Sequence, residues 1–322
     1  MFVLVWWKVL PLFLAMGMGY LSGALKVFPR PADAVDVLNR YALYFGFPLL
    51  IFQGFCRPSL VLSSNPGFYV FHVLMAAMIV GGIVWVGGWF QATRGVRGGL
   101  VLGTLFGNVA YLGMPLSIQI LGSSYLGWIA LSVTLQVFFS MALGPLALVM
   151  LRESGRGDKE ERRRLLRKLV RQPLLWAPVL GFLVRFSLPA QTLQGIATPL
   201  SFFASSAAPV ALFLLGLHIW NHQHTLRRIR VDVWGMLLCK LCLVPLMAFA
   251  LGWCFVKWGW MARQEWRVVL VLSFMPTAIT TFSIAKDFRE NEDLMAQAIL
   301  LSTLITLLAL PLLIPFVVQW TS

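Results

Sequence analysis

Long apolar stretches constrain the fold of this chain more than any other feature of its sequence. A helix needs about 20 consecutive apolar residues to cross the hydrocarbon layer of a bilayer. Hydrophobic residues make up 59% of the chain and charged residues only 12%, which is too apolar for a water-soluble core. We therefore predict an all-α polytopic membrane protein with ten transmembrane helices. These cover residues 4–24, 37–56, 68–91, 98–121, 124–150, 173–188, 194–219, 231–256, 266–286 and 293–318.

The positive charge of the chain predicts its orientation. The net charge is +14, but the basic residues lie in short loops between apolar stretches, so we expect no nucleic-acid partner. Nineteen of the 26 Lys and Arg residues fall in alternate loops, nine of them in the basic segment 152–172. Because basic loops stay in the cytoplasm, we predict a multi-pass protein of the inner (plasma) membrane with both termini outside.

The two halves of the chain resemble each other at an offset of 161 residues. At this offset Pro48 falls on Pro209 and Pro115 falls on Pro276. Five helices per half is an odd number, so the second half would enter the membrane from the opposite side. We predict two inverted five-helix repeats, residues 1–151 and 173–322, joined by the cytoplasmic basic loop 152–172. Inverted repeats with interrupted helices in matching positions are typical of secondary transporters.

The fourth and ninth predicted helices each contain a helix breaker. Gly113, Met114 and Pro115 interrupt one, and Met275 and Pro276 interrupt the other. In a bilayer, the freed backbone groups must face protein or a water-filled cavity. A half-helix that starts there presents N–H groups and the positive end of its dipole, which favour an anion. With the side-chain amide of Asn108 nearby, we expect two crossed broken helices to bind a carboxylate.

Four segments resemble the signature segments of the auxin efflux carrier family. This family includes plant auxin exporters and bacterial permeases for small organic acids. The resemblance follows the order of the family over most of the chain, and the segment around Asn108 is its most specific part. The segments read LNRYALYFGFPLLIFQGF (38–55), GNVAYLGMPLSIQILG (107–122), ASSAAPVALFLLGLHI (204–219) and MPTAITTFSIAKDF (275–288).

The resemblance implies a bacterial-type permease or efflux carrier for small organic anions. It implies ten helices in two inverted repeats, with crossed broken helices four and nine. It also implies an elevator-like movement of helices three to five and eight to ten against a scaffold of helices one, two, six and seven. A homodimer through the scaffold helices is one alternative for the oligomeric state, which stays open. Asn108, Pro115 and Pro276 match the crossover positions. Asn108 has no repeat partner, because Val269 stands at the equivalent position.

Two further polar residues are candidate ligands of the anion. Lys240 lies about 13 Å into the eighth predicted helix, where a charge predicts a functional role. It would either attract the anion or take the place of a coupling cation. Thr277 follows the second helix break and would contact the substrate. All twelve acidic residues lie in loops or at helix ends, which weakens any mechanism in which a buried carboxylate carries protons or binds sodium.

Other functions remain as alternatives. A membrane-embedded enzyme would need paired carboxylates, metal ligands or a nucleophile–base pair, and none is visible in the predicted helices, so we expect no catalysis and no cofactor. Cys239 and Cys242 lack neighbouring ligands for a metal. The same fold could serve as an anion channel or a sensor, or take up anions with sodium like a bile-acid symporter. Proton or sodium coupling stays open.

Overall fold

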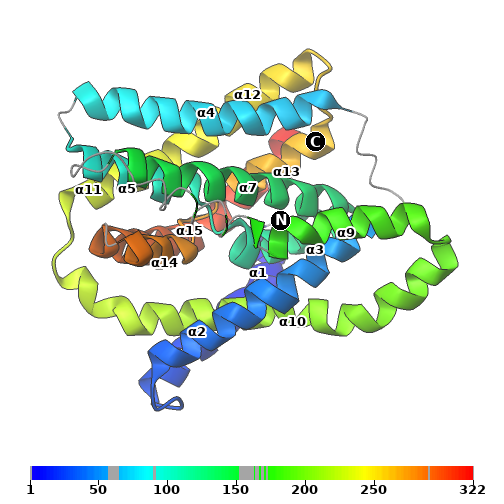
Figure 1. Ribbon diagram of the computed structural model, residues 1–322, viewed down its shortest axis with the longest axis horizontal. Helices are drawn as coiled ribbons and strands as arrows, with labels where there is room; N and C mark the ends of the chain where they lie inside the picture. Colours follow the sequence, from blue (N-terminus) through cyan, green and yellow to red (C-terminus); the bar gives the residue numbers. More distant parts are fainter. Residues whose placement is uncertain are drawn as a thin grey trace.

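The structure is a bundle of helices (Figure 1). It is a computed structural model that describes residues 2–56, 65–89, 92–151, 163, 167, 170–171, 173–288 and 291–321. Within these ranges all regular elements are helical, and the only strand-like pairing is an isolated antiparallel bridge between Gly107 and Thr277. This agrees with the predicted all-α class. Most of the basic segment 152–172 lies outside the described residues.

The helices follow the apolar stretches closely. In the first half they are α1 (Phe2–Ala24), α2 (Pro31–Tyr41), η1 (Ala42–Gly46), α3 (Phe47–Cys56), α4 (Pro66–Trp89), α5 (Arg94–Leu105), η2 (Val109–Gly113), α6 (Met114–Leu121), η3 (Ser123–Tyr125) and α7 (Leu126–Met150). In the second half they are α9 (Pro173–Ser187), α10 (Ala190–His222), η4 (Gln223–Arg227), α11 (Val231–Leu238), η5 (Cys239–Leu243), α12 (Val244–Lys257), α13 (Arg263–Ser273), α14 (Thr280–Phe288) and α15 (Glu292–Thr321).

Six helical segments of the described chain are long and apolar enough to cross a membrane. They are Pro31–Cys56, Pro66–Trp89, Ser123–Met150, Thr198–Arg227, Val231–Lys257 and Glu292–Leu310. Helices also lie in the other four predicted ranges: α1 covers 4–24, and the helices in the other three ranges are shorter or interrupted. The protein is therefore a multi-pass helical membrane protein, whereas ten crossings, the inverted repeat and the division into two halves stay predictions.

The helices pack as two neighbouring groups. One group contains α1, α2, α3, α9 and α10, in which α1 lies along α10 and α3 lies along α9. The other contains α4, α5, α7 and α11 to α15, in which α5 packs on α7 and α12 packs on α13. Figure 1 shows α10 along one edge of the molecule and α4 along the opposite edge, with α5 and α7 between them. The two groups meet where α3 contacts α7 and where η2 contacts α10.

Glycines bring α1 and α10 into backbone contact. A Cβ atom on Gly19 would lie 1.9 Å from the carbonyl oxygen of Phe213, and one on Gly216 would lie 1.9 Å from the carbonyl oxygen of Met16. No side chain fits at such distances. The two helices are therefore held by close backbone packing, which is common between membrane helices.

Three π-helical turns accommodate three prolines. η1, η2 and η5 each end two residues before a proline, namely Pro48, Pro115 and Pro245. Proline lacks an N–H and collides with the carbonyl four residues earlier, and the wider π-turn relieves both problems. Our prediction that Gly113, Met114 and Pro115 break the fourth helix is therefore wrong in position. The helix runs from η2 into α6 through these residues with ordinary helical angles at Gly113 and Met114.

Substituting Gly19 by Ala should destabilise the protein, because the new methyl group would collide with the backbone of α10. We expect the free energy of unfolding to fall by about 3 kcal/mol, the upper range for overpacking. The matched control is Gly17→Ala on the same helix, where a Cβ meets no atom within 4 Å. Thermal unfolding in detergent measures both variants, and equal melting temperatures would contradict the packing described for α1 and α10.

Candidate functional site

Two interrupted helices cross at the centre of the candidate site. The first is interrupted at residues 106–108, between α5 and η2, and the second at residues 274–279, between α13 and α14. The interruptions pair with each other: the Asn108 N–H donates to the Pro276 carbonyl oxygen at 2.7 Å, and the Ala278 N–H donates to the Phe106 carbonyl oxygen at 2.9 Å. Met275 and Pro276 thus lie at a break as predicted, whereas the first break lies before Asn108.

The last carbonyl groups of α5 all accept hydrogen bonds, some of them from side chains of other helices. The Thr277 hydroxyl donates to the Gly103 carbonyl oxygen at 3.1 Å, and the Ser140 hydroxyl donates to that of Leu105 at 3.0 Å. The Phe106 N–H completes the set by donating to Leu102 at 3.1 Å. Helix ends that are buried without partners are costly, so these bonds stabilise the break.

Lys240 satisfies the remaining carbonyl of this helix end. Its ammonium group donates to the Thr104 carbonyl oxygen at 2.9 Å, and the residue is only 4% exposed. A Cβ atom on Gly107 would lie 2.9 Å from Lys240 Nζ, so a glycine at 107 leaves room for the lysine. Among the described residues, Lys240 forms no ion pair with a carboxylate. Its charge therefore faces the negative ends of helix dipoles.

A small cavity adjoins Lys240. It has a volume of about 50 Å³, and its lining includes Leu105 at the end of α5 and Leu272 and Ser273 at the end of α13. His72 and Gln136 also line it. His72 Nδ1 lies 2.8 Å from the Phe68 carbonyl oxygen, which can only accept, so Nδ1 carries the proton and Nε2 accepts from the Ser132 hydroxyl at 2.9 Å. The C-terminal ends of both first half-helices thus face this cavity.

A second cavity lies on the other side of the crossing. It has a volume of about 30 Å³, and it is lined by the starts of both second half-helices, residues 108–111 and 278–280. Asn108 is 3% exposed, and its side-chain nitrogen has no hydrogen-bond partner in the described part of the chain. A buried amide N–H without a partner is costly, so this group is free to bind a ligand.

The predicted ligands divide between the two cavities and the crossing. Asn108 lines the cavity at the half-helix starts, and Lys240 lines the cavity at the half-helix ends. The other predicted site residues line neither cavity, and their roles in binding stay predictions: Gly113, Met114, Pro115, Met275, Pro276 and Thr277. Among the described residues, no cluster of three or more His, Cys, Asp or Glu side chains could hold a metal ion.

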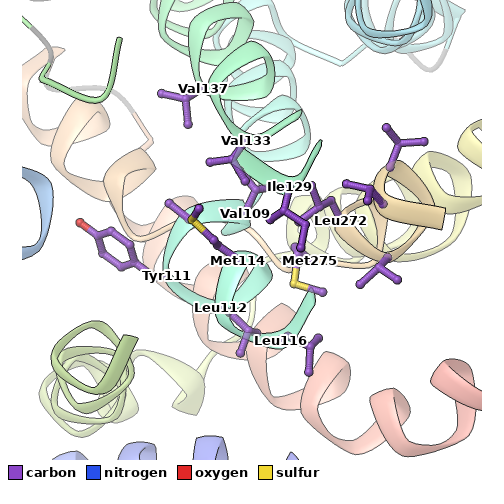
Figure 2. Close-up of a cluster of buried hydrophobic side chains, with 14 of the residues drawn as sticks. Val109, Tyr111, Leu112, Met114, Leu116, Ile129, Val133, Val137, Leu272 and Met275 are labelled. Atoms are coloured by element: carbon purple, nitrogen blue, oxygen red, sulfur yellow. The ribbon is translucent and has the colours of Figure 1, made fainter. Parts of the chain in front are cut away.

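Gly113 and Met114 have a packing role. A Cβ atom on Gly113 would lie 2.9 Å from side-chain atoms of Leu272 and Met275, so the glycine allows the two interrupted helices to approach closely. Figure 2 shows Met114 and Val109 in one apolar cluster with the α7 side chains, and Met275 and Leu272 beside it. This cluster fixes the position of η2 and α6, and with them the position of Asn108.

No sequence pattern indicated the contact that joins Tyr111 to the other group of helices. The Tyr111 hydroxyl donates to Asn39 Oδ1 of α2, and its ring stacks on Phe47 of α3 at a centroid distance of 5.1 Å. In Figure 2, Tyr111 points away from the apolar cluster. Only the tertiary fold brings these three residues together, so no local pattern could have predicted the contact.

Replacing Thr277 by Val should weaken the crossing, because Gly103 loses the hydroxyl that bonds to its carbonyl. We expect the free energy of unfolding to fall by about 2 kcal/mol. Thr281→Val is the matched control: its hydroxyl donates to the Ala278 carbonyl, which also accepts from the Thr281 N–H. Thermal unfolding in detergent compares the two buried threonines. A control as unstable as Thr277→Val would show that the loss is not specific to the crossing.

Comparisons with known proteins identify relatives of this chain among membrane transporters. The profile of the membrane transport protein family matches residues 4–314. An uncharacterized transporter of Methanothermobacter thermautotrophicus is 26% identical over 311 residues, covering 94% of this chain and 95% of that protein. An uncharacterized transporter of Methanocaldococcus jannaschii is 24% identical over 303 residues, covering 91% and 92%. The chain therefore belongs to the membrane transport protein family, that of the auxin efflux carriers which its signature segments resemble.

Proposed function

We propose that this protein is a secondary active carrier for small organic anions such as carboxylates. The observation that carries the proposal is the convergence of two half-helix starts and the unpartnered Asn108 amide on one buried cavity. First-turn N–H groups and helix dipoles favour a negative charge at this place. The amide adds a neutral donor, which can bind a carboxylate without holding it as tightly as a charged group would.

The polarity of the crossing supports an anion at Asn108 and a cation at Lys240. The helix ends that face the Lys240 cavity are both C-terminal and carry partial negative charge, whereas those at Asn108 are both N-terminal. The Lys240 ammonium occupies the side where a coupling cation would be favoured. We therefore propose that Lys240 takes the place of that cation, and that transport does not need sodium.

The two groups of helices suggest how the cargo crosses the membrane. The cavity at Asn108 lies between them, because Leu43 of η1 and Leu174 of α9 belong to one group and Val137 of α7 belongs to the other. We propose an elevator-like movement in which the group with the crossing carries the anion past the group formed by α1, α2, α3, α9 and α10. We also propose that the protein lies in the inner (plasma) membrane with both termini outside. It would contain two inverted repeats and form a homodimer through the group of α1, α2, α3, α9 and α10.

Transport of labelled organic acids into proteoliposomes should depend on Asn108. We expect saturable uptake with counterflow, and a reduction of about tenfold or more in Asn108→Ala, the loss of one hydrogen bond to a charged group. Asn108→Asp should abolish uptake, because a carboxylate repels the anion. The control is Asn65→Ala. The Asn65 side-chain amide donates to Glu265 and lies away from the crossing. Uptake without saturation or counterflow would favour a channel, and consumption of the acid would indicate an enzyme.

Substituting Lys240 by Met should slow transport strongly, because the Thr104 carbonyl loses its partner and the helix ends lose their balancing charge. Lys257→Met is the control: Lys257 is exposed at the end of α12, where its ammonium group lies over the Trp253 ring. An imposed sodium gradient should leave the wild-type rate unchanged. If Lys240→Met left the rate, affinity and pH dependence of transport unchanged, Lys240 would have no role in transport. If sodium stimulated wild-type transport, the proposal that Lys240 replaces a coupling cation would be contradicted.

A further inference from the structure

We propose that the cavity at Asn108 selects short aliphatic monocarboxylates over dicarboxylates and over large aromatic acids. This inference rests on the proposed function and narrows its substrate class. It follows from three properties of the cavity: its donors lie on one wall, the other walls are apolar, and its volume is small.

The donors gather where the two second half-helices begin. Asn108 Nδ2 is buried and unpartnered. The helix that starts at Val109 runs for 13 residues to Leu121, and its first intrahelical bonds are those that Leu112 and Gly113 donate to the Asn108 carbonyl. The N–H groups of residues 109–111 precede these bonds, and these three residues line the cavity. Thr280 adds the start of the nine-residue α14, but the N–H groups of Thr281 and Phe282 already donate to the Ala278 and Ile279 carbonyls, so this helix contributes mainly through its dipole. One carboxylate can accept several of these bonds at once.

The other walls offer nothing to a second charge. They consist of apolar side chains from three helical elements, and no charged residue lines the cavity: Leu43 of η1, Val137 and Met141 of α7, and Leu174 of α9. A second carboxylate would lose its water there without gaining a donor, which is far more costly than burying methylene groups. The tail of the preferred acid is therefore apolar.

The volume of the cavity limits the length of this tail. At about 30 Å³ it has room for roughly two or three water-sized groups. Acetate has four non-hydrogen atoms and butyrate six, so these acids enter only when Leu43 and Leu174 move outward, whereas an indole ring would need the helices to separate. The structure thus favours acids of about two to four carbons.

Competition binding to the purified protein tests the selectivity directly. Labelled butyrate is the probe, and acetate, propionate, butyrate, hexanoate, malonate, succinate and indole-3-acetate compete at a pH where all are ionised. We expect affinity to rise about threefold to fourfold per methylene from acetate to butyrate, the gain from burying one methylene, and then to stop rising. Succinate and malonate should bind at least tenfold more weakly than butyrate.

Two variants test whether the apolar walls set this order. Leu174→Ala removes three carbons from the wall, so the preferred acid should become longer by about two carbons, while Leu175→Ala, which does not line the cavity, should leave the order unchanged. Met141→Lys places a positive group opposite Asn108 and should improve succinate relative to butyrate. Each variant is compared only after its thermal unfolding shows that it is folded. The competition experiment on the wild-type protein tests the selectivity even if neither variant folds.

The outcomes separate this inference from the proposed function. Dicarboxylates that bind as well as butyrate, with binding lost in Asn108→Ala, would overturn the selectivity and leave the anion carrier intact. Indole-3-acetate that binds more tightly than butyrate would do the same. If none of the acids bound to the wild-type protein, and none was transported, the carrier proposal itself would fail.

Discussion

The pairing of two backbone interruptions holds the centre of this protein together. Asn108 donates to Pro276 and Ala278 donates to Phe106, so each interrupted helix supplies the partners that the other lacks. Because no water is available inside a bilayer to hydrogen-bond the backbone, a single interruption would leave several N–H and C=O groups unsatisfied. The two interruptions are therefore interdependent. The small residues Gly107 and Gly113 follow from the same requirement, because the segments must approach closely enough for these bonds to form.

The crossing also separates the negative ends of the helix dipoles from the positive ends. Two C-terminal ends face the Lys240 cavity and two N-terminal ends face the Asn108 cavity, although both cavities lie within one crossing. A buried lysine is costly in an apolar surrounding, yet here it bonds a helix-end carbonyl and faces partial negative charge. One geometric arrangement thus accounts for a fixed cation on one side and for the proposed affinity for anions on the other. No ionised carboxylate is needed for either.

The sequence was sufficient for features that depend on composition and local chemistry. Apolar runs predicted the helices, and Pro276 marked a real interruption because its missing N–H coincides with a segment that pairs elsewhere. The same reasoning failed at Pro115, because a π-helical turn accommodates this proline within a continuous helix. The break before Asn108 carries no proline and depends on pairing with residues more than 160 positions away. The cavity walls at Leu43 and Leu174 could not be predicted either, because no local sequence pattern shows how their helices pack.

The asymmetry of the site bears on how an anion would be held. At the predicted repeat offset of 161 residues Asn108 falls on Val269, which lies buried within α13 and carries no amide. A carboxylate has two oxygens, and the amide can satisfy only one of them well. The other must rely on first-turn N–H groups, whose positions are fixed by the pairing of the interruptions. In the proposed site, binding therefore depends on the integrity of the crossing, and a movement that loosened the pairing would weaken the hold on the anion.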